Sequence, residues 1–485
     1  MENPLYTGAG EAAELIARGE VTALELTDAA ISRIAALDSL VNAVVVPDFD
    51  RARAMAKRAD EAVRQGHRLP LLGVPITVKE SFPVAGLPTS WGIPEFRDWR
   101  PTSEALAVQR LRRAGAIILG KTNVSEGLAD WQCTNRVFGR TNNPWDVRRT
   151  PGGSSGGSAA ALAAGFSFLE LGSDSAGSIR IPAHFCGVFG HRPTYGLISS
   201  QGYNFPKTYA PSDLSTVGPM ARTAADLMLA LDQLAGPGGL ESRAYRLELP
   251  NARHKRLADF RCLVLDEHPL VRSSSDVVTP IRRVEGFLRK QGVTVATSSP
   301  LLPDLADVAR LCVRLLVPMT LYRVSEQHYQ AVVDRAGRLS PDDDSLTATS
   351  LRAGVGSHRD WLRANEGRAR LALLWQRLFR EWDVIICPVS PTVAFPHDDR
   401  PPEDRTLEVD GVSIAYSDQI AWSTLAIPCG LPATAVPAGS TERGLPVGFQ
   451  IVGPAFEDRT TIALAGMIEA EMGGFTRPIS IANRQ

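Results

Sequence analysis

The sequence has no run of about 18 apolar residues, the length that a helix needs to cross a membrane. Its first residues, MENPLYTGAGEAAEL, do not combine a basic segment with an apolar one, as a secretory signal peptide does. These two absences argue against a membrane-spanning or exported protein. We therefore expect a cytoplasmic protein that has no membrane partner.

An excess of charge of either sign is also missing, because 52 basic residues face 53 acidic residues and the net charge is −1. The basic clusters, RARAMAKR at 51–58 and Arg148 with Arg149, have acidic residues nearby and are typical of solvated helix faces. Proteins that bind nucleic acids concentrate positive charge on one surface. The sequence therefore predicts no nucleic-acid partner.

Metal-binding patterns are absent as well. The cysteines lie far apart and form no CxxC pair: Cys133, Cys186, Cys262, Cys312, Cys387 and Cys429. His184 and His191 flank Cys186, but their spacing is not that of a zinc site. We expect buried free thiols and structural histidines, with neither a metal nor a cofactor.

What is present is the composition of an ordinary globular protein of 485 residues, 44% of them hydrophobic. Strand and helix patterns alternate in the first half: helices before residue 66, a strand at 71–80, a helix at 104–115, a strand at 116–122, a helix at 158–165 and a strand at 166–174. Later segments add an irregular stretch at 236–260, helices over 304–381 and a closing helix at 459–472. This pattern predicts an α/β fold with a large mixed, mostly parallel twisted sheet, covered on both faces by helices.

The stretch PGGSSGGS at 151–158 is either a flexible linker or a sharply bent loop. Because ordered elements flank it, we expect a loop. It matches GxSxG, but the polar segment NNPWDVRRTPGG before it lacks the strand of a nucleophile elbow. It also lacks the Lys-Ser or Lys-Thr pair of a phosphate-binding loop. Ser154 and Ser155 therefore serve either turn chemistry or a different kind of active site.

Two further segments carry candidate chemistry at strand ends, where the active sites of α/β sheets gather. Lys79 follows the apolar run GVPITV, although a lysine there can also extend its amine to water. Ser178 follows FSFLEL within GSDSAGSIRIP, after the small residues Ser175, Ala176 and Gly177. Backbone N–H groups in so tight a turn could converge on a developing oxyanion, or the turn could serve packing alone.

Lys79, Ser154 and Ser178 follow one another at spacings of 75 and 24 residues. In this order, and in the motifs around them, the sequence resembles the amidase signature family of serine hydrolases. The matching stretches extend over nearly the whole chain: GVPITVKE, GKTNVSEG, GRTNNPWD, PGGSSGGS, GSDSAGSIRIPAHFCGVFG, GLPATAVPAG and GLPVGFQIVGP. The resemblance implies a single amidase domain over 1–485, with a catalytic signature core at 66–225 and a variable, substrate-shaping subregion at 260–400.

The resemblance also assigns roles to individual residues. It implies that Ser178 is the nucleophile, that Ser154 is held by a cis peptide bond, and that Lys79 is the general base. The N–H groups of Ser175, Ala176, Gly177 and Ser178 would form the oxyanion hole. The sequence departs from the family at Ala176, where a glycine is common and where the methyl group would narrow the acyl site, and at GHRPT, where His191 and Arg192 precede Pro-Thr instead of a lysine.

These roles are chemically consistent. A serine hydroxyl is a weak nucleophile until a base removes its proton, and Ser154 could relay that proton from Ser178 to Lys79. The lysine must then be neutral, which requires its pKa to fall by about three units from its usual 10.4. Desolvation could supply such a shift.

The resemblance implies cleavage of the C–N bond of small-molecule amides through an acyl-enzyme, by a monomer or homodimer. Carbamate hydrolysis remains an alternative, as does an amidase subunit of a glutamine-dependent amidotransferase, which would need partner subunits. A catalytically silent binding protein is the third alternative. The segments least like the family should shape the substrate pocket, and their candidate residues are Leu128, Asp130, Trp131, Gln132, Tyr203 and Cys312. The aromatic residues in these segments favour a bulky apolar substrate, although core packing explains their presence equally well.

Overall fold

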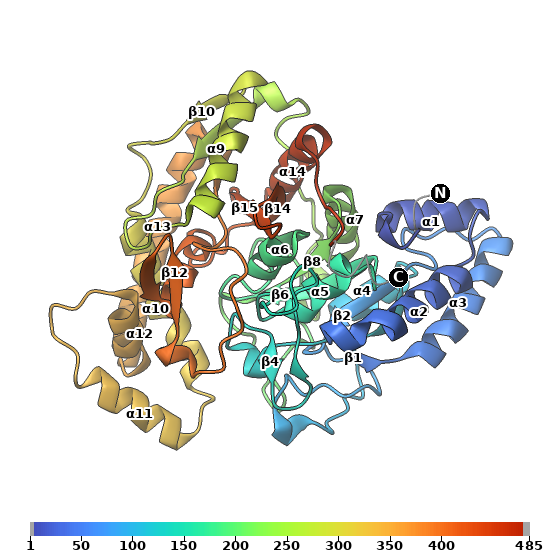
Figure 1. Cartoon of the computed structure of the whole chain (residues 1–485), viewed down its shortest axis with the longest axis horizontal. Helices are drawn as coiled ribbons and strands as arrows, with labels where there is room; N and C mark the ends of the chain where they lie inside the picture. Colours follow the sequence, from blue (N-terminus) through green and yellow to red (C-terminus); the bar gives the residue numbers. More distant parts are fainter. Residues whose placement is uncertain (1–3, 479–485) are drawn as a thin grey trace.

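The computed structural model describes residues 4–478, and in this range one large twisted sheet organises the chain (Figure 1). Its strands lie in the order β1-β3-β2-β6-β8-β7-β14-β15-β11-β9-β10. Their bounds are β1 (Val44–Pro47), β2 (Pro75–Lys79), β3 (Ile117–Thr122), β6 (Leu169–Asp174), β7 (Phe189–Arg192), β8 (Thr216–Ala221), β9 (Arg261–Val264), β10 (Thr294–Ala296), β11 (Val384–Pro388), β14 (Ala433–Ser440) and β15 (Pro446–Val452). Two small hairpins lie outside the sheet: β4 (Thr134–Asn135) with β5 (Gly139–Arg140), and β12 (Thr406–Val409) with β13 (Val412–Ala415).

The predicted α/β architecture, a large mixed sheet covered by helices, is confirmed. The helices are α1 (Ala9–Arg18), α2 (Ala23–Val41), α3 (Phe49–Arg64), α4 (Leu106–Arg113), α5 (Gly156–Ala163), α6 (Arg180–Cys186), α7 (Ala224–Leu234), α8 (Glu241–Ala244), α9 (Ser275–Lys290), α10 (Leu305–Leu321), α11 (Glu326–Ala336), α12 (Leu346–Gly354), α13 (His358–Glu381) and α14 (Asp458–Met472). Figure 1 shows α1–α3 at one end of the molecule and α10–α13 at the other, with α5, α6 and β6 between them.

The expectation that the sheet is mostly parallel is wrong. Strands β2 and β3, β2 and β6, β9 and β11, and β9 and β10 pair in parallel, whereas the other neighbours in the sheet pair antiparallel. Parallel pairs need long crossover connections, which the strand-helix alternation of the first half supplies. Among the antiparallel neighbours, β14 and β15 form a hairpin in which Ser440 pairs with Pro446, whereas β7 and β14 pair although they lie far apart in the sequence.

The strands that lead to the predicted site are buried along their whole length. Every residue of β2 and β6 is buried, as is every residue of the helix α5 that packs on them. The sequence of α5, GGSAAALA, has only small side chains apart from one leucine, and this lets the helix approach the sheet closely. Because β2 and β6 are parallel neighbours, their carboxyl ends and the polar residues that follow them meet at one edge.

The buried histidines and cysteines have structural surroundings, as expected. The His184 ring accepts a hydrogen bond from the Gly448 N–H (2.7 Å) and contacts the Thr392 carbonyl (3.0 Å). Burial lowers the pKa of His184 to about 4, so the ring is neutral. His191 contacts Thr434 and Asp458. All six cysteines are free thiols, and Cys429 alone is not fully buried.

Two negative findings concern residues 4–478. None of the helices in this range combines the length and the apolar character needed to cross a bilayer. No group of three or more histidine, cysteine, aspartate or glutamate side chains within the same range could hold a metal ion.

Candidate active site

Lys79, the predicted base, is the last residue of β2 and has no exposed surface. Its Nζ lies 2.7 Å from the Ser154 hydroxyl and 3.0 Å from the Ser173 hydroxyl. The structure therefore brings Lys79 and Ser154 together across 75 residues of sequence. Ser173, the second partner, was not among the predicted site residues.

Burial determines the charge of Lys79. Desolvation lowers the pKa of its amine to about 7, against the opposing effects of Cys133, Asp174 and Glu170. A lysine with this pKa is about half unprotonated at pH 7, whereas an exposed lysine is almost entirely charged. The shift has the direction and the size that a lysine base requires.

Ser154 lies in the glycine-serine loop that leads into α5. All residues of 151–158 are buried, so this stretch is not a linker. The Gly153–Ser154 peptide bond is cis, as the resemblance implied. Other chain segments approach the loop so closely that a Cβ on Gly153 would lie 2.4 Å from the Asp130 carbonyl oxygen, and a Cβ on Gly157 would lie 2.4 Å from the Asn123 nitrogen. Glycine is therefore required at both positions.

Ser155 joins this loop to the predicted nucleophile turn. Its backbone N–H donates to the Ser178 carbonyl (3.1 Å), and its hydroxyl donates to the Ser173 carbonyl (3.3 Å). Sequence reasoning could not separate the role of Ser155 from that of the loop. The structure places it as a connection between the two serine segments.

Ser178 lies in the turn between β6 and α6 and is 7% exposed, whereas Ser154 is 1% exposed and Lys79 is fully buried. Of these three side chains, Ser178 is thus the one most open to an incoming molecule. The Gly177 N–H, one of four predicted oxyanion donors, instead donates to the Asp174 carboxylate (3.0 Å). In the described part of the chain, the N–H groups of Ser175, Ala176 and Ser178 donate to no protein acceptor.

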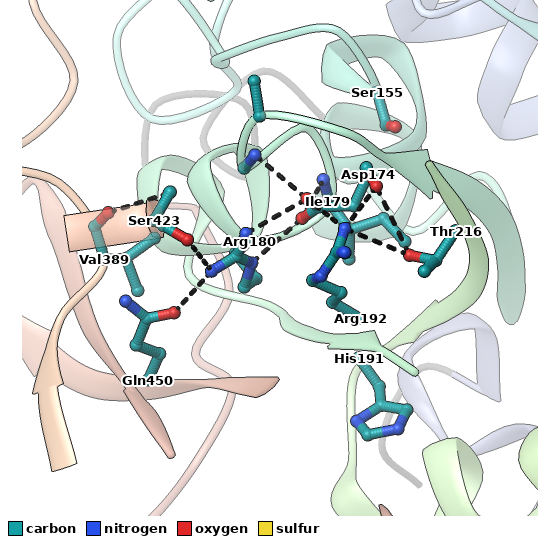
Figure 2. A network of polar contacts seen from close by, with 12 residues as sticks. Ser155, Asp174, Ile179, Arg180, His191, Arg192, Thr216, Val389, Ser423 and Gln450 are labelled. Carbon is teal, nitrogen blue, oxygen red and sulfur yellow. Dashed lines mark hydrogen bonds and ion pairs between the residues drawn. The ribbon is translucent and has the colours of Figure 1, made fainter. Parts of the chain in front are cut away.

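Asp174 organises the nucleophile turn through two buried arginines (Figure 2). Arg180 donates from Nε and Nη2 to the two carboxylate oxygens (3.0 and 3.1 Å), and Arg192 Nη1 contacts one of them (3.2 Å). Burial alone would raise the pKa of Asp174, but the two guanidiniums hold it well below its usual range. The carboxylate stays charged and also receives the Gly177 and Ile179 N–H groups, which fixes the turn.

The same network explains one departure from the family pattern. Arg192 stands where the resemblance led us to expect a lysine, and it donates to the carbonyls of Asp174 (2.5 Å) and Leu214 (2.9 Å) as well as to the Asp174 carboxylate. Arg180 in turn reaches the Gln450 side chain (2.8 Å) and the Ser423 carbonyl (3.2 Å). Sequence reasoning missed this cluster because no local pattern shows which arginine faces which acid.

Comparisons with known proteins identify the family of this chain. A family model described as Amidase matches residues 25–462. The chain is 34% identical over 492 residues to a protein of Roseiflexus castenholzii that is named as a subunit of glutamyl-tRNA(Gln) amidotransferase, with 98% of each chain covered. This chain belongs to the amidase signature family. As an amidase, it is an enzyme that acts on carbon-nitrogen bonds.

Solved structures show the same fold as this amidase. One, from work entitled "An unexpected vestigial protein complex reveals the evolutionary origins of an s-triazine catabolic enzyme", superposes with a TM-score of 0.81 at 29% identity and covers 97% of this chain and 100% of its own. Another, described as "Crystal structure of amidase", has a TM-score of 0.74 at 31% identity and covers 96% of this chain and 100% of its own.

Trp131 is the predicted pocket residue of this amidase that directly contacts the nucleophile turn, because its indole N–H donates to the Ala176 carbonyl (3.0 Å). Asp130 accepts hydrogen bonds from Arg405 (2.7 Å) and from the Tyr416 hydroxyl (2.6 Å). The two donors lie side by side at the open end of the β12–β13 hairpin, where the Tyr416 N–H also donates to the Arg405 carbonyl (3.3 Å). Asp130 therefore anchors the hairpin beside the site.

The other predicted pocket residues differ in their surroundings. Gln132 is bound to the backbone of Asp398 through both ends of its amide, and Leu128 ends a short 3-10 helix in a left-handed conformation (φ 60°). Cys312 has no exposed surface and packs in the apolar core, where burial raises the pKa of its thiol to about 12, and its place in the pocket stays a prediction. Tyr203 is buried, and its hydroxyl donates to Ser173 (2.7 Å).

A cavity of about 640 Å³ lies between α10, α12 and α13. Its lining includes Arg314, Met319 and Trp361 but neither Cys312 nor any of the predicted catalytic side chains. Within α10, the cavity is lined by Arg314, Pro318 and Met319.

Removing the charge of Asp174 tests the network. Asp174→Asn leaves two buried guanidiniums without their counter-charge, and we expect a loss of about 3 to 5 kcal/mol in the free energy of unfolding. The measurement is urea denaturation followed by circular dichroism. The matched control is Arg148→Gln, which removes an exposed ion pair with Asp146 and should leave the denaturation midpoint unchanged. Equal midpoints for Asp174→Asn and wild type would contradict a stabilising role.

Proposed function

We propose that this amidase hydrolyses the C–N bond of small-molecule amides through an acyl-enzyme on Ser178. Ser154 passes protons between Ser178 and Lys79. The observation that carries the proposal is the fully buried Lys79 amine, whose Nζ lies 2.7 Å from the Ser154 hydroxyl and whose pKa burial lowers to about 7. A neutral amine in contact with a hydroxyl is the pairing that activates a serine without a histidine.

In the first half-reaction, neutral Lys79 takes the Ser154 proton while Ser154 takes the proton of Ser178. The Ser178 oxygen attacks the amide carbon, and the resulting oxyanion faces the N–H groups of Ser175, Ala176 and Ser178. The C–N bond then breaks. The proton returns from Lys79 through Ser154 to the leaving nitrogen, and amine or ammonia departs.

In the second half-reaction, water attacks the Ser178 ester. Its proton passes through Ser154 to Lys79, so that the attacking oxygen becomes a hydroxide equivalent. When the tetrahedral intermediate collapses, the bond to Ser178 breaks and that oxygen recovers the proton by the same route. The carboxylic acid leaves, and Lys79 is again neutral.

The proposed catalytic groups lie within residues 66–225, which we assign as the catalytic core of a single amidase domain. Residues 260–400, with α10–α13, would shape the substrate side. Trp131 is the pocket residue best supported by contact with the nucleophile turn. The Ala176 methyl group, next to that contact, is still expected to narrow the acyl site. The first three and last seven residues of the proposed domain fall outside the described range.

An amidase subunit of a glutamine-dependent amidotransferase is the second candidate. It is favoured by the curated relatives at 30 to 34% identity, which match along nearly their whole length and are named as subunits of glutamyl-tRNA(Gln) amidotransferase. In that case the acyl-enzyme would form from glutamine, and partner subunits would use the ammonia. Carbamates form a comparable tetrahedral intermediate and remain an alternative substrate class.

The nucleophile is tested by Ser178→Ala, for which we expect a loss of about 10⁴-fold or more in kcat. A fluorophosphonate should add covalently to Ser178 in the wild type, as located by mass spectrometry of its peptides, and should not label the variant. Ser340→Ala, which changes an exposed serine, is the control and should retain both labelling and activity. Labelling of another residue, or full activity of Ser178→Ala, would refute the assignment.

The pH profile tests Lys79. The active form is the neutral amine, so activity should be lost as the pH falls through about 7 and should reach a plateau above about 8. The measurement is kcat/KM for an activated anilide, with acylation shown to be rate-limiting. Lys79→Met should abolish the activity. A flat profile between pH 6 and 9 would count against a lysine base.

Substrate class is tested with the isolated chain. Hydrolysis rates are compared over aliphatic amides, anilides, carbamates, dipeptide amides and glutamine. We expect amide turnover without a partner. Turnover of carbamates alone would replace the amide proposal, and turnover of glutamine only in the presence of partner subunits would favour the amidotransferase.

A further inference from the structure

A buried chain of hydroxyl groups leads away from Lys79 through its second partner, Ser173. The Lys79 amine donates to the Ser173 hydroxyl oxygen (3.0 Å), to which the Tyr203 hydroxyl also donates (2.7 Å). The Tyr203 oxygen lies 3.1 Å from the Ser81 hydroxyl. All of these side chains are buried, so water does not compete for the bonds.

The direction of donation along this chain is fixed. Tyr203 has one proton and gives it to Ser173, so Ser81 must be the donor to Tyr203. Burial raises the pKa of Tyr203 to about 12, so the phenol keeps that proton over the range in which Lys79 titrates. The Ser173 oxygen therefore accepts two hydrogen bonds, from Lys79 and from Tyr203.

This double acceptance has two consequences for Lys79. A neutral amine has two N–H groups and one lone pair, and an N–H directed at Ser173 leaves the lone pair free to face Ser154. A hydroxyl oxygen that already accepts from a phenol is also a weaker acceptor for an ammonium group. The arrangement thus favours the neutral, correctly oriented amine.

We propose that Tyr203 is a positioning residue that acts through Ser173 to aim the Lys79 amine at Ser154 and to disfavour its protonation. This inference rests on the proposed function, in which Lys79 is the base. It replaces our expectation that Tyr203 contacts the substrate.

The fold holds Tyr203 firmly in this place. Its ring stacks on Phe82 (4.3 Å between centroids) and on Trp91 (5.4 Å), and the edge of Phe205 meets Trp91 (5.2 Å). Arg323, just beyond α10, lies over Phe205 (4.9 Å). The connection between β7 and β8 is largely irregular, and these contacts fix the part of it that carries Tyr203.

Several charged or titratable groups surround the pair. Lys79 is faced by Cys133, by Asp174 and by Glu170, whose own pKa is raised to about 7 by burial. Tyr203 is faced by Glu80 and Arg323. None of these side chains is altered when Tyr203 loses its hydroxyl. A shift in the pH dependence of kcat/KM that follows this loss therefore reports on the chain of hydroxyl groups.

Tyr203→Phe tests the inference because it keeps the ring and removes the donor. We expect the ascending limb of kcat/KM to move up by about half to one pH unit, kcat on the plateau to fall about tenfold, and KM to stay within twofold of wild type. Tyr6→Phe is the matched control, because it removes a hydroxyl bonded to the Ala164 carbonyl and should leave the limb in place.

If Tyr203→Phe does not fold, Ser173→Ala is the second variant, and it tests whether the Ser173 hydroxyl acts on the protonation of Lys79. This variant removes a hydrogen-bond acceptor of the Lys79 ammonium group. The ascending limb of kcat/KM should therefore move to lower pH, while kcat falls. An unchanged limb in the folded variant would overturn the inference. A rise in KM alone in Tyr203→Phe would also overturn it, in favour of a substrate contact.

The wild type and Lys79→Met separate this inference from the proposed function. If the wild type shows no limb near pH 7, or if Lys79→Met stays active, the proposed function itself fails. If both behave as expected and Tyr203→Phe matches the wild type at every pH, only the role of Tyr203 is refuted.

Discussion

The site depends on the desolvation of one amine. Strand β2 is buried along its length, so Lys79 at its end has no route to water, and its nearest partners are the hydroxyls of Ser154 and Ser173 rather than a carboxylate. A carboxylate in direct contact would stabilise the ammonium form and raise the pKa again. Asp174 is close enough to act on Lys79, but its charge is balanced by Arg180 and Arg192. The arginine cluster thus serves the proposed base as well as the nucleophile turn.

Packing and hydrogen bonds together hold the glycine-serine loop and the turn that carries Ser178. Small residues in the glycine-serine loop and in α5 bring the backbone of 151–163 against its neighbours, and Ser155 then ties this segment to Ser178 through a backbone bond. On the other side, Trp131 holds the Ala176 carbonyl, while Asp130 holds the β12–β13 hairpin. The turn that carries Ser178 is therefore restrained both by the glycine-serine loop and by Trp131.

The sequence could predict whatever is encoded by local pattern. Apolar runs that end in Lys79 or lead to Ser178 indicated strand ends at one edge of a sheet, and the motifs around them indicated the family. Pairing between distant segments could not be predicted in this way. Nothing near Tyr203 shows that its hydroxyl meets Ser173, and nothing near Cys312 shows that its face of α10 turns inward. The antiparallel centre of the sheet could not be predicted, because the direction in which neighbouring strands pair depends on tertiary packing rather than on the residues of each strand.

The anchors of Arg180 come from late in the chain, at Ser423 and Gln450. During synthesis, Lys79, Ser154 and Ser178 all emerge long before these residues. A chain that ends before residue 423 contains the proposed catalytic side chains and the Asp174 partner of Arg180, but it lacks the two contacts that Arg180 makes with Ser423 and Gln450. The complete set of contacts around Arg180 therefore forms only after the segment that carries Gln450 has been synthesised.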